Sequence, residues 1–257
     1  MECYEESNNN RDIWLYDLAR DTASRFTLDQ SDDADPVWSP DGKTIALSSN
    51  RLGAVDVFRK STGGATGDEL MIKTPGSTPV MAWSPDGWTI AVLQTSAGAD
   101  LLGYEVGSNA TPRPIVAGPF TELELQFSPD GRFISYSSDE SGRAEIYVQR
   151  WPQTGEKWQV STDGATDARW RGDGKELFYV SPTRDLMAVS IDTRNGFRAG
   201  TPVRLFQTRV AGPLGSGHRF PYAVSADGQR FVIYVNDKNA PPPSITVIVN
   251  WPALLKQ

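Results

Sequence analysis

The sequence predicts an all-β protein of repeated four-stranded antiparallel sheets, on three observations. Near copies of one motif, an apolar residue followed by Ser-Pro-Asp-Gly, recur along the 257 residues. The aspartates of five such motifs lie 45, 44, 43 and 54 residues apart, a period that fits a propeller blade. A run rich in β-branched and aromatic residues follows each motif, and helical periodicity is absent. We therefore expect a β-propeller. The five aspartates are Asp41, Asp86, Asp130, Asp173 and Asp227.

Each motif predicts a tight turn between two strands. Pro presets φ at the second turn position, Asp tolerates the next position, and Gly takes the positive φ that closes the hairpin. The five aspartates are therefore turn residues and not catalytic residues. The aromatic residues Trp38, Trp83 and Trp170 precede the turns, and we expect them in the core. The strands predicted after the turns are 44–47, 89–93, 133–136, 176–180 and 230–234.

Further strands follow each of these pairs and bring the number to four per unit. They are predicted at 55–59 with 70–73, at 145–150 with 157–160, and at 186–191 with 203–206. One domain, 1–257, would then contain blades near 33–75, 76–118, 119–162, 163–208 and 215–251.

The two ends of the chain bear on how the propeller closes. Residues 12–18 and 24–28 match the third and fourth strands of a blade whose first two strands are absent. We expect residues 12–28 to complete the last blade and to close a ring of five blades, because closure removes exposed strand edges. The alternative is that the chain is the tail of a longer protein.

The repeat resembles that of TolB-like β-propellers, relatives of the WD-repeat proteins. In the C-terminal half, the segments 157–161, 174–179 and 245–251 are similar to the propeller that ends certain bacterial serine/threonine protein kinases. The sequence contains no kinase Gly-rich loop, His-Arg-Asp or Asp-Phe-Gly motif. The resemblance therefore implies no phosphoryl transfer.

Composition narrows the range of partners. The formal net charge is −7, from 32 acidic and 25 basic residues, and no Lys/Arg cluster is present, which argues against nucleic acid or an anionic membrane. The sequence shows no apolar window of membrane-spanning length and no signal-peptide pattern. We expect a soluble monomer, cytoplasmic as written, with its natural compartment left open. The single cysteine, Cys3, excludes an internal disulfide and a Cys-based zinc site.

One repeated position is a candidate site. The residues three before the motif's apolar residue are Asp35, Val80, Glu124, Asp167 and Pro221. Because the innermost strands of a propeller line its channel, we expect these positions to form a ring that carries three carboxylates. Oxygen ligands of this kind suit calcium, and Asp33 and Glu122 would thicken the cluster. The alternative is that these are turn caps and water-facing strand residues.

Two classes of function remain. The first is a module that binds or senses a small neutral ligand or a protein partner. The second is a calcium-dependent hydrolase of lactones or esters, in which Asp35, Glu124 and Asp167 hold the metal. His218, the single histidine, would then act as base or orient the water; otherwise it is an idle loop residue. Because Gly-x-Ser-x-Gly and Ser-x-x-Lys motifs are absent, a serine nucleophile is not expected.

Overall fold

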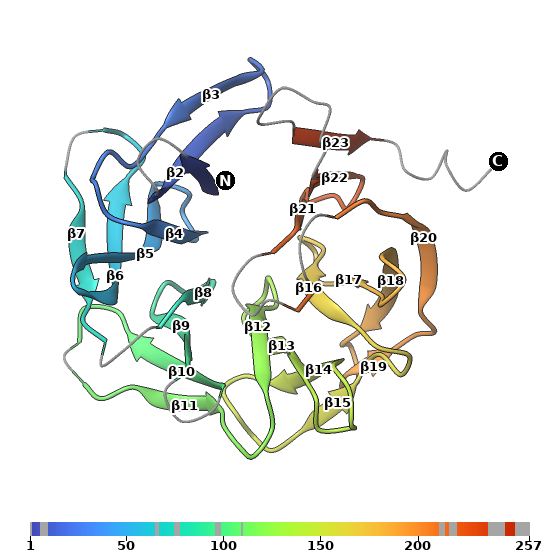
Figure 1. The fold of residues 1–257 in the computed structure, drawn as a ribbon. Helices are drawn as coiled ribbons and strands as arrows, with labels where there is room; N and C mark the ends of the chain where they lie inside the picture. The colour runs from blue at the N-terminus through green and yellow to red at the C-terminus, as the bar shows by residue number, and fades with distance from the viewer. Residues whose placement is uncertain are drawn as a thin grey trace. The chain divides into compact units, whose positions relative to one another are not determined.

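The chain forms two compact units, Met1–Ala117 and Gly118–Gln257, and each is described by itself (Figure 1). The computed structural model describes residues 2–5, 10–64, 67–74, 78–95, 99–108, 110–210, 214–215, 220–235 and 245–249, with 2–5 and 245–249 described by their backbone alone. Every named element in these ranges is a β-strand. Within them, accordingly, no helix has the length and apolarity needed to cross a membrane.

The first unit contains three antiparallel sheets, and the strands of each follow one another in chain order. The first sheet is β1 (Glu2–Glu5), β2 (Asn10–Asp17) and β3 (Thr22–Arg25). The second is β4 (Asp33–Trp38), β5 (Thr44–Leu52), β6 (Ala54–Ser61) and β7 (Glu69–Ile72). The third is β8 (Val80–Trp83), β9 (Thr89–Gln94), β10 (Asp100–Glu105) and β11 (Arg113–Val116).

The second unit also contains three antiparallel sheets. One is β12 (Glu122–Phe127), β13 (Phe133–Ser138), β14 (Glu145–Arg150) and β15 (Lys157–Gln159). The next is β16 (Thr166–Trp170), β17 (Glu176–Val180), β18 (Asp185–Asp192) and β19 (Arg198–Ala199), with β20 (Val203–Gln207) also paired to β18. The last is β21 (Tyr222–Val224), β22 (Arg230–Tyr234) and β23 (Ile245–Val249).

The four-stranded sheets confirm the all-β class and the strands predicted after each turn. In the first unit, β2 pairs with β1 on one side and with β3 on the other. Glu2–Glu5 lies in register with Ile13–Asn10, and the completion of the last blade by residues 12–28 stays a prediction. The count of five blades, the closure of a ring and the single domain stay predictions.

The Ser-Pro-Asp-Gly turns have the predicted structural role. Ser39 Oγ donates to Asp41 Oδ1 at 2.6 Å and accepts from the Thr44 amide at 3.0 Å. Asp41 Oδ1 also accepts from the Lys43 amide at 3.1 Å, and Gly42 takes the positive φ of 68° that the turn requires. The same contacts recur at Ser84, Ser128 and Ser225. The turn aspartates are thus occupied in holding the hairpins.

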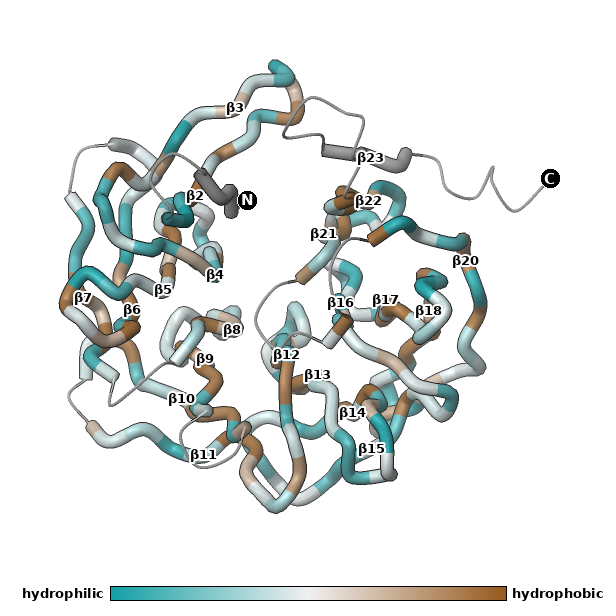
Figure 2. Tube along the Cα trace, viewed as in Figure 1, coloured by the Kyte–Doolittle hydropathy of each residue, from teal (hydrophilic) through white to brown (hydrophobic). Residues whose placement is uncertain are grey.

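Apolar side chains pack between successive sheets within each unit, as expected for β-sheets stacked face to face. Figure 2 shows hydrophobic residues along strands such as β9 and β10, with hydrophilic residues in the turns. In the first unit, one cluster joins the first two sheets through Ile13, Phe26, Ile45, Leu47 and Phe58. In the second unit, Phe178 and Phe231 meet edge to face, with ring centroids 5.1 Å apart. These interfaces hold the strands that carry the candidate site.

One expected core residue is not in the core. Trp170 is buried as predicted, but the Trp38 side chain is 53% exposed. Trp38 lines a hollow of about 370 Å³ together with residues of the first sheet. That sheet contributes Leu15 and Tyr16 to the hollow together with the polar residues Asp17, Arg20 and Thr22, whereas Trp170 packs in an apolar cluster.

Candidate functional site

The three predicted carboxylates share an unusual backbone conformation. Asp35, Glu124 and Asp167 have positive φ values of 52°, 63° and 61°. Each lies at a register shift in the first strand of its sheet, where two residues oppose one on the neighbouring strand. This is a β-bulge whose left-handed position usually takes glycine. A side chain there stores backbone strain, a feature that clusters at functional sites.

Two of these carboxylates meet in the second unit. Glu124 lies on β12 and Asp167 lies on the neighbouring strand β16, and the Asp167 amide donates to Glu124 Oε2 at 2.6 Å. Ser137 Oγ donates to the same oxygen at 3.1 Å. Asp167 Oδ2 accepts from Thr166 Oγ1 at 2.8 Å and from the Gly215 amide at 3.5 Å. We call Glu124 and Asp167 the carboxyl pair.

The carboxyl pair is buried but incompletely satisfied. Glu124 and Asp167 are each 1% exposed. Among the described residues, Glu124 Oε1 and Asp167 Oδ1 have no hydrogen-bond partner, and neither has the buried hydroxyl of Tyr222 on β21. A buried polar atom without a partner is destabilising. This group therefore has hydrogen-bonding capacity that the fold itself does not use.

Burial also sets the charge of the carboxyl pair. Burial, together with the charge of Asp167, raises the pKa of Glu124 to about 8. Burial raises the pKa of Asp167 too, although the hydrogen bonds from Thr166 and Gly215, the charge of Arg169 and a side-chain hydrogen bond with Glu124 oppose this. The pKa of both carboxyls is thus raised by burial, and that of Glu124 lies above neutral pH, so Glu124 is protonated at pH 7.

Arg169 balances the remaining negative charge. Its guanidinium lies 3.3 Å from the ring centroid of Phe220, and Arg169 Nε donates to the Tyr222 carbonyl at 3.5 Å. Burial lowers the pKa of Arg169 to about 10, so it stays positive at neutral pH. Its charge lowers the pKa of both members of the carboxyl pair. At pH 7 the carboxyl pair and Arg169 are together close to neutral.

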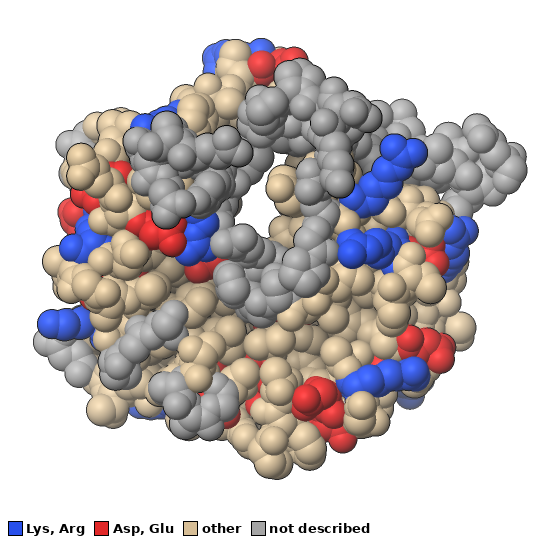
Figure 3. All heavy atoms as spheres, viewed as in Figure 1, with Lys and Arg blue, Asp and Glu red and all other residues tan. Residues whose placement is uncertain are grey.

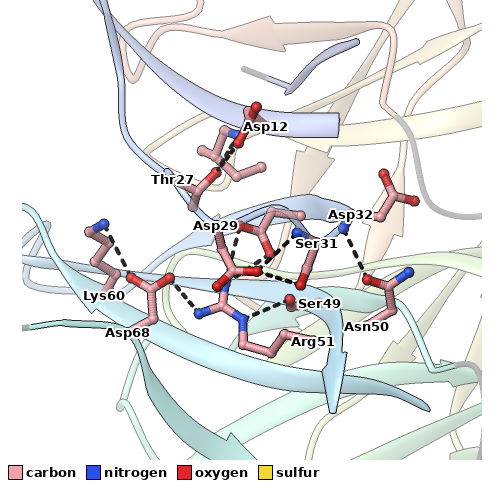
Figure 4. Close-up of polar contacts among 12 residues, drawn as sticks. Asp12, Thr27, Asp29, Ser31, Asp32, Ser49, Asn50, Arg51, Lys60 and Asp68 are labelled. Atoms are coloured by element: carbon pink, nitrogen blue, oxygen red, sulfur yellow. Dashed lines mark hydrogen bonds and ion pairs between the residues drawn. The ribbon is translucent and has the colours of Figure 1, made fainter. Parts of the chain in front are cut away.

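The other predicted ligands have different surroundings. Asp35 occupies the same bulge position in β4 of the first unit and is buried. Asp33 binds a guanidinium: Arg51 Nη2 lies 2.9 and 3.1 Å from its two oxygens. Arg51 also reaches Ser49 and Asp68 (Figure 4). Burial raises the pKa of Asp33 despite hydrogen bonds from Ser49 and Arg51. Asp33 is thus part of an ion network.

The predicted metal site and the predicted role of His218 stay predictions. Glu122 is buried at the start of β12. Within either unit, the described side chains include no group of three His, Cys, Asp or Glu residues that could bind one metal ion. His218 lies outside the described residues. The structure thus brings together Glu124 and Asp167 from the predicted set.

A second set of buried carboxylates was missed in the sequence. Asp12, Asp56 and Glu145 are buried near the start of β2, β6 and β14. Each accepts hydrogen bonds from a Thr or Ser in the segment that follows: Thr27 donates to Asp12 at 3.1 Å, and the Thr74 amide donates to Asp56 at 2.7 Å. Figure 4 shows the first of these contacts. The available signal was an acidic residue recurring at positions 12, 56, 100 and 145.

Charge is dispersed over the visible surface. On the face drawn in Figure 3, the described acidic and basic side chains lie in small mixed groups with uncharged surface between them. This face of the described chain presents no broad basic area of the kind that binds nucleic acid.

Comparison with known proteins identifies the fold. No family model and no curated protein matches the sequence. TolB from Acinetobacter baumannii superposes with a TM-score of 0.75 at 16% identity, over 93% of this chain and 57% of that one. A putative TolB from Agrobacterium tumefaciens gives a TM-score of 0.67 at 18% identity, over 90% of this chain and 81% of that one. The fold is that of a TolB-like β-propeller.

Other structures with this TolB-like fold have different functions. Oligogalacturonate lyase in complex with manganese matches with a TM-score of 0.60 at 15% identity, over 96% of this chain and 69% of that one. At these identities the likeness shows the fold alone, because propellers host many unrelated functions. The similarity to kinase-linked propellers stays a prediction. The function of this TolB-like chain must be argued from its own residues.

Proposed function

We propose that this chain is a binding module that recognises a small, neutral, polar ligand and leaves it chemically unchanged. One observation carries the proposal: Glu124 Oε1, Asp167 Oδ1 and the Tyr222 hydroxyl are buried and have no protein partner among the described residues. Burial of these atoms without partners destabilises the free protein. A ligand that forms hydrogen bonds with them removes that free-energy cost. This is the usual composition of a ligand site, a few convergent polar groups in buried surroundings.

The charge of the site favours a neutral ligand. Glu124 keeps its proton at pH 7, and Arg169 offsets the charge of Asp167. A charged ligand would leave an unbalanced buried charge, which is strongly unfavourable. Hydroxyl, lactone and amide groups of a ligand can form hydrogen bonds with Glu124, Asp167 and the Tyr222 hydroxyl. A protein partner that inserts an amide or hydroxyl side chain would offer the same chemistry.

The calcium-dependent hydrolase is the second candidate, and the unpartnered carboxyl oxygens are what favours it. The described residues of the second unit fit calcium poorly, however. Calcium takes six to eight oxygen ligands, whereas the carboxyl pair supplies the oxygens of two side chains, and the positive charge of Arg169 opposes a cation there. We therefore derive no catalytic step through a metal.

A ligand-observed NMR screen tests the binding proposal. The probes are monosaccharides, small lactones and primary amides, and the decisive variant is Tyr222→Phe, which removes only the unpartnered hydroxyl. Tyr136→Phe is the matched control, because Tyr136 is a buried tyrosine of the same unit whose hydroxyl has a partner, Gln149, at 3.4 Å. We expect binding to the wild type and the control, and binding about fivefold weaker in Tyr222→Phe, from one lost hydrogen bond.

The same samples decide between the two candidates. We expect no hydrolysis of the lactones, with calcium or with chelator. Turnover that needs calcium and disappears in Asp167→Asn would replace the binding module by the hydrolase. Equal binding to the wild type and to Tyr222→Phe would show that the carboxyl pair and Tyr222 are not the site.

A further inference from the structure

We propose that the first unit carries a separate binding site for an organic cation, a ligand with a guanidinium or primary ammonium group. The site is a hollow of about 490 Å³ lined by residues of the second and third sheets, among them Asp41, Arg59, Glu69, Trp83 and Asp86. We call it the Trp83 groove. Its volume lies in the range of small-ligand pockets. The proposal is independent of the carboxyl pair in the second unit.

The aromatic wall of the Trp83 groove is fixed in place. Trp83 is half-buried on β8, and its Nε1 donates to the Gly87 carbonyl at 3.0 Å. That hydrogen bond uses the single polar atom of the indole and orients the ring. What the side chain offers a ligand in the groove is therefore the apolar surface of its ring, and tryptophan is the aromatic residue that attracts cations most strongly.

Two carboxylates of the groove have capacity to spare. Asp41 and Asp86 each use Oδ1 to hold their turns, accepting from a serine hydroxyl and from the amide two residues on. Oδ2 of each takes part in none of the hydrogen bonds or ion pairs found in the described part of the chain. The hydrogen bond from Ser39 lowers the pKa of Asp41, so that carboxylate is ionised at neutral pH.

The remaining charges of the groove do not neutralise these two carboxylates. Arg59 pairs with Glu69 at 3.0 Å, so that pair is balanced within itself. Lys43 follows the first turn, and its charge lowers the pKa of Asp41, but no ion pair joins the two described side chains. The groove therefore combines two unbalanced carboxylates with a tryptophan face, and the net charge of −7 attracts cations from a distance.

At two equivalent turns of the second unit, the turn aspartate forms an ion pair with a neighbouring arginine. Asp130 Oδ2 pairs with Arg132 at 2.7 Å, and Asp173 binds Arg171 through both of its oxygens. Residue 132 directly follows the turn glycine, and Trp88 occupies that position in the third sheet. The third sheet thus has Trp88 at the position that Arg132 occupies in the second unit, so no arginine at that position pairs with Asp86, and its Oδ2 is available to a ligand.

The first unit also contains an internal control. The hollow beside Trp38 is lined by an exposed tryptophan and by Asp17, as the Trp83 groove is by Trp83 and its aspartates. There, Asp17 pairs with Arg20 at 2.7 Å, so no unbalanced carboxylate faces the tryptophan. We expect the hollow beside Trp38 to bind no cation.

Isothermal titration with N-acetyl-arginine amide tests the proposal, with N-acetyl-citrulline amide as the neutral isostere. The variant is Asp41→Asn with Asp86→Asn, because asparagine keeps the Oδ1 acceptor that each turn needs. We expect the double variant to weaken arginine binding about tenfold, the combined loss of two exposed charge contacts, and Asp17→Asn to leave it unchanged. Thermal melts of all variants verify that they fold.

Two further ligands, titrated in the same way, distinguish a free metabolite from a peptide side chain as the source of the cation. Agmatine represents a free metabolite and acetyl-Gly-Arg-Gly-amide represents a peptide side chain; tighter binding of one indicates its class. Citrulline amide that binds as tightly as arginine amide would overturn the proposal, because recognition would then not depend on charge. Unchanged binding in the double variant would overturn it as well, and so would a loss in Asp17→Asn.

Discussion

Two sets of buried carboxylates can be compared in this chain, and they differ in how completely the protein satisfies them. At the start of β14, Glu145 accepts from the Gly164 amide and from Arg143 Nε, both at 2.8 Å, and from the Ser161 hydroxyl. In the bulge of the first strands, Glu124 and Asp167 each keep one buried oxygen without a partner in the described structure.

The comparison separates a structural role from a binding role. A fully hydrogen-bonded buried carboxylate fastens neighbouring segments, and removing it leaves its donors unsatisfied. A carboxylate with an unused oxygen costs stability unless a proton or a ligand compensates. Equal burial therefore does not mean equal function, and the hydrogen-bond inventory distinguishes the two sets.

The largest effect should follow from removing a satisfied carboxylate. We expect Glu145→Ala to lower the free energy of unfolding by about 3 kcal/mol, since the Ser161 hydroxyl and the Gly164 amide lose their acceptor. Urea denaturation measures it. Glu145→Gln, which keeps one acceptor oxygen, should lose less. A change below about 0.5 kcal/mol in Glu145→Ala would show that this carboxylate does not hold the sheet.

A matched pair of serine variants sharpens the comparison. Ser161 Oγ donates to Glu145 and accepts from the Ile146 amide at 2.8 Å, whereas Ser137 Oγ donates to Glu124 Oε2 at 3.1 Å. We expect Ser161→Ala to cost about 2 kcal/mol and Ser137→Ala about 0.5 to 1 kcal/mol. The same denaturation experiment compares them. Equal losses would mean that the two carboxylates are held alike.

The smallest effect is expected at the carboxyl pair itself. Glu124→Gln keeps a carbonyl oxygen for the Asp167 amide and removes the need to hold a proton. We therefore expect its free energy of unfolding at pH 5, where holding the proton on Glu124 costs little, to lie within about 1 kcal/mol of the wild type. A loss of about 3 kcal/mol, as in Glu145→Ala, would place Glu124 in the structural set.

The sequence predicted the repeated strands, the turns and the position of the bulge carboxylates, because these follow from a local motif repeated at nearly constant spacing. It predicted that Glu124 and Asp167 lie close together, but not that the Asp167 amide donates to Glu124 or that Glu124 is protonated. Both depend on the contact between β12 and β16 and on desolvation. The exposure of Trp38 was missed for a similar reason, since it depends on polar side chains of the preceding sheet.

The central claim is that Glu124 holds a proton at neutral pH in the folded chain. Its pKa is raised from 4.5 to about 8, so the folded state binds more protons than the unfolded state between these values. Stability is then greatest below about pH 4.5 and falls as the pH rises toward 8, by up to about 1.4 kcal/mol per pH unit. Other carboxylates also make the free energy of unfolding depend on pH. Subtracting the values for Glu124→Gln from those of the wild type removes their contribution.

The most direct test is therefore the free energy of unfolding from pH 5 to pH 9 for the wild type and for Glu124→Gln. We expect the wild type to lose stability relative to Glu124→Gln as the pH rises, and the difference to level off above about pH 8. Parallel curves over the whole range would contradict it, because Glu124 would then be ionised at neutral pH like an ordinary surface carboxylate.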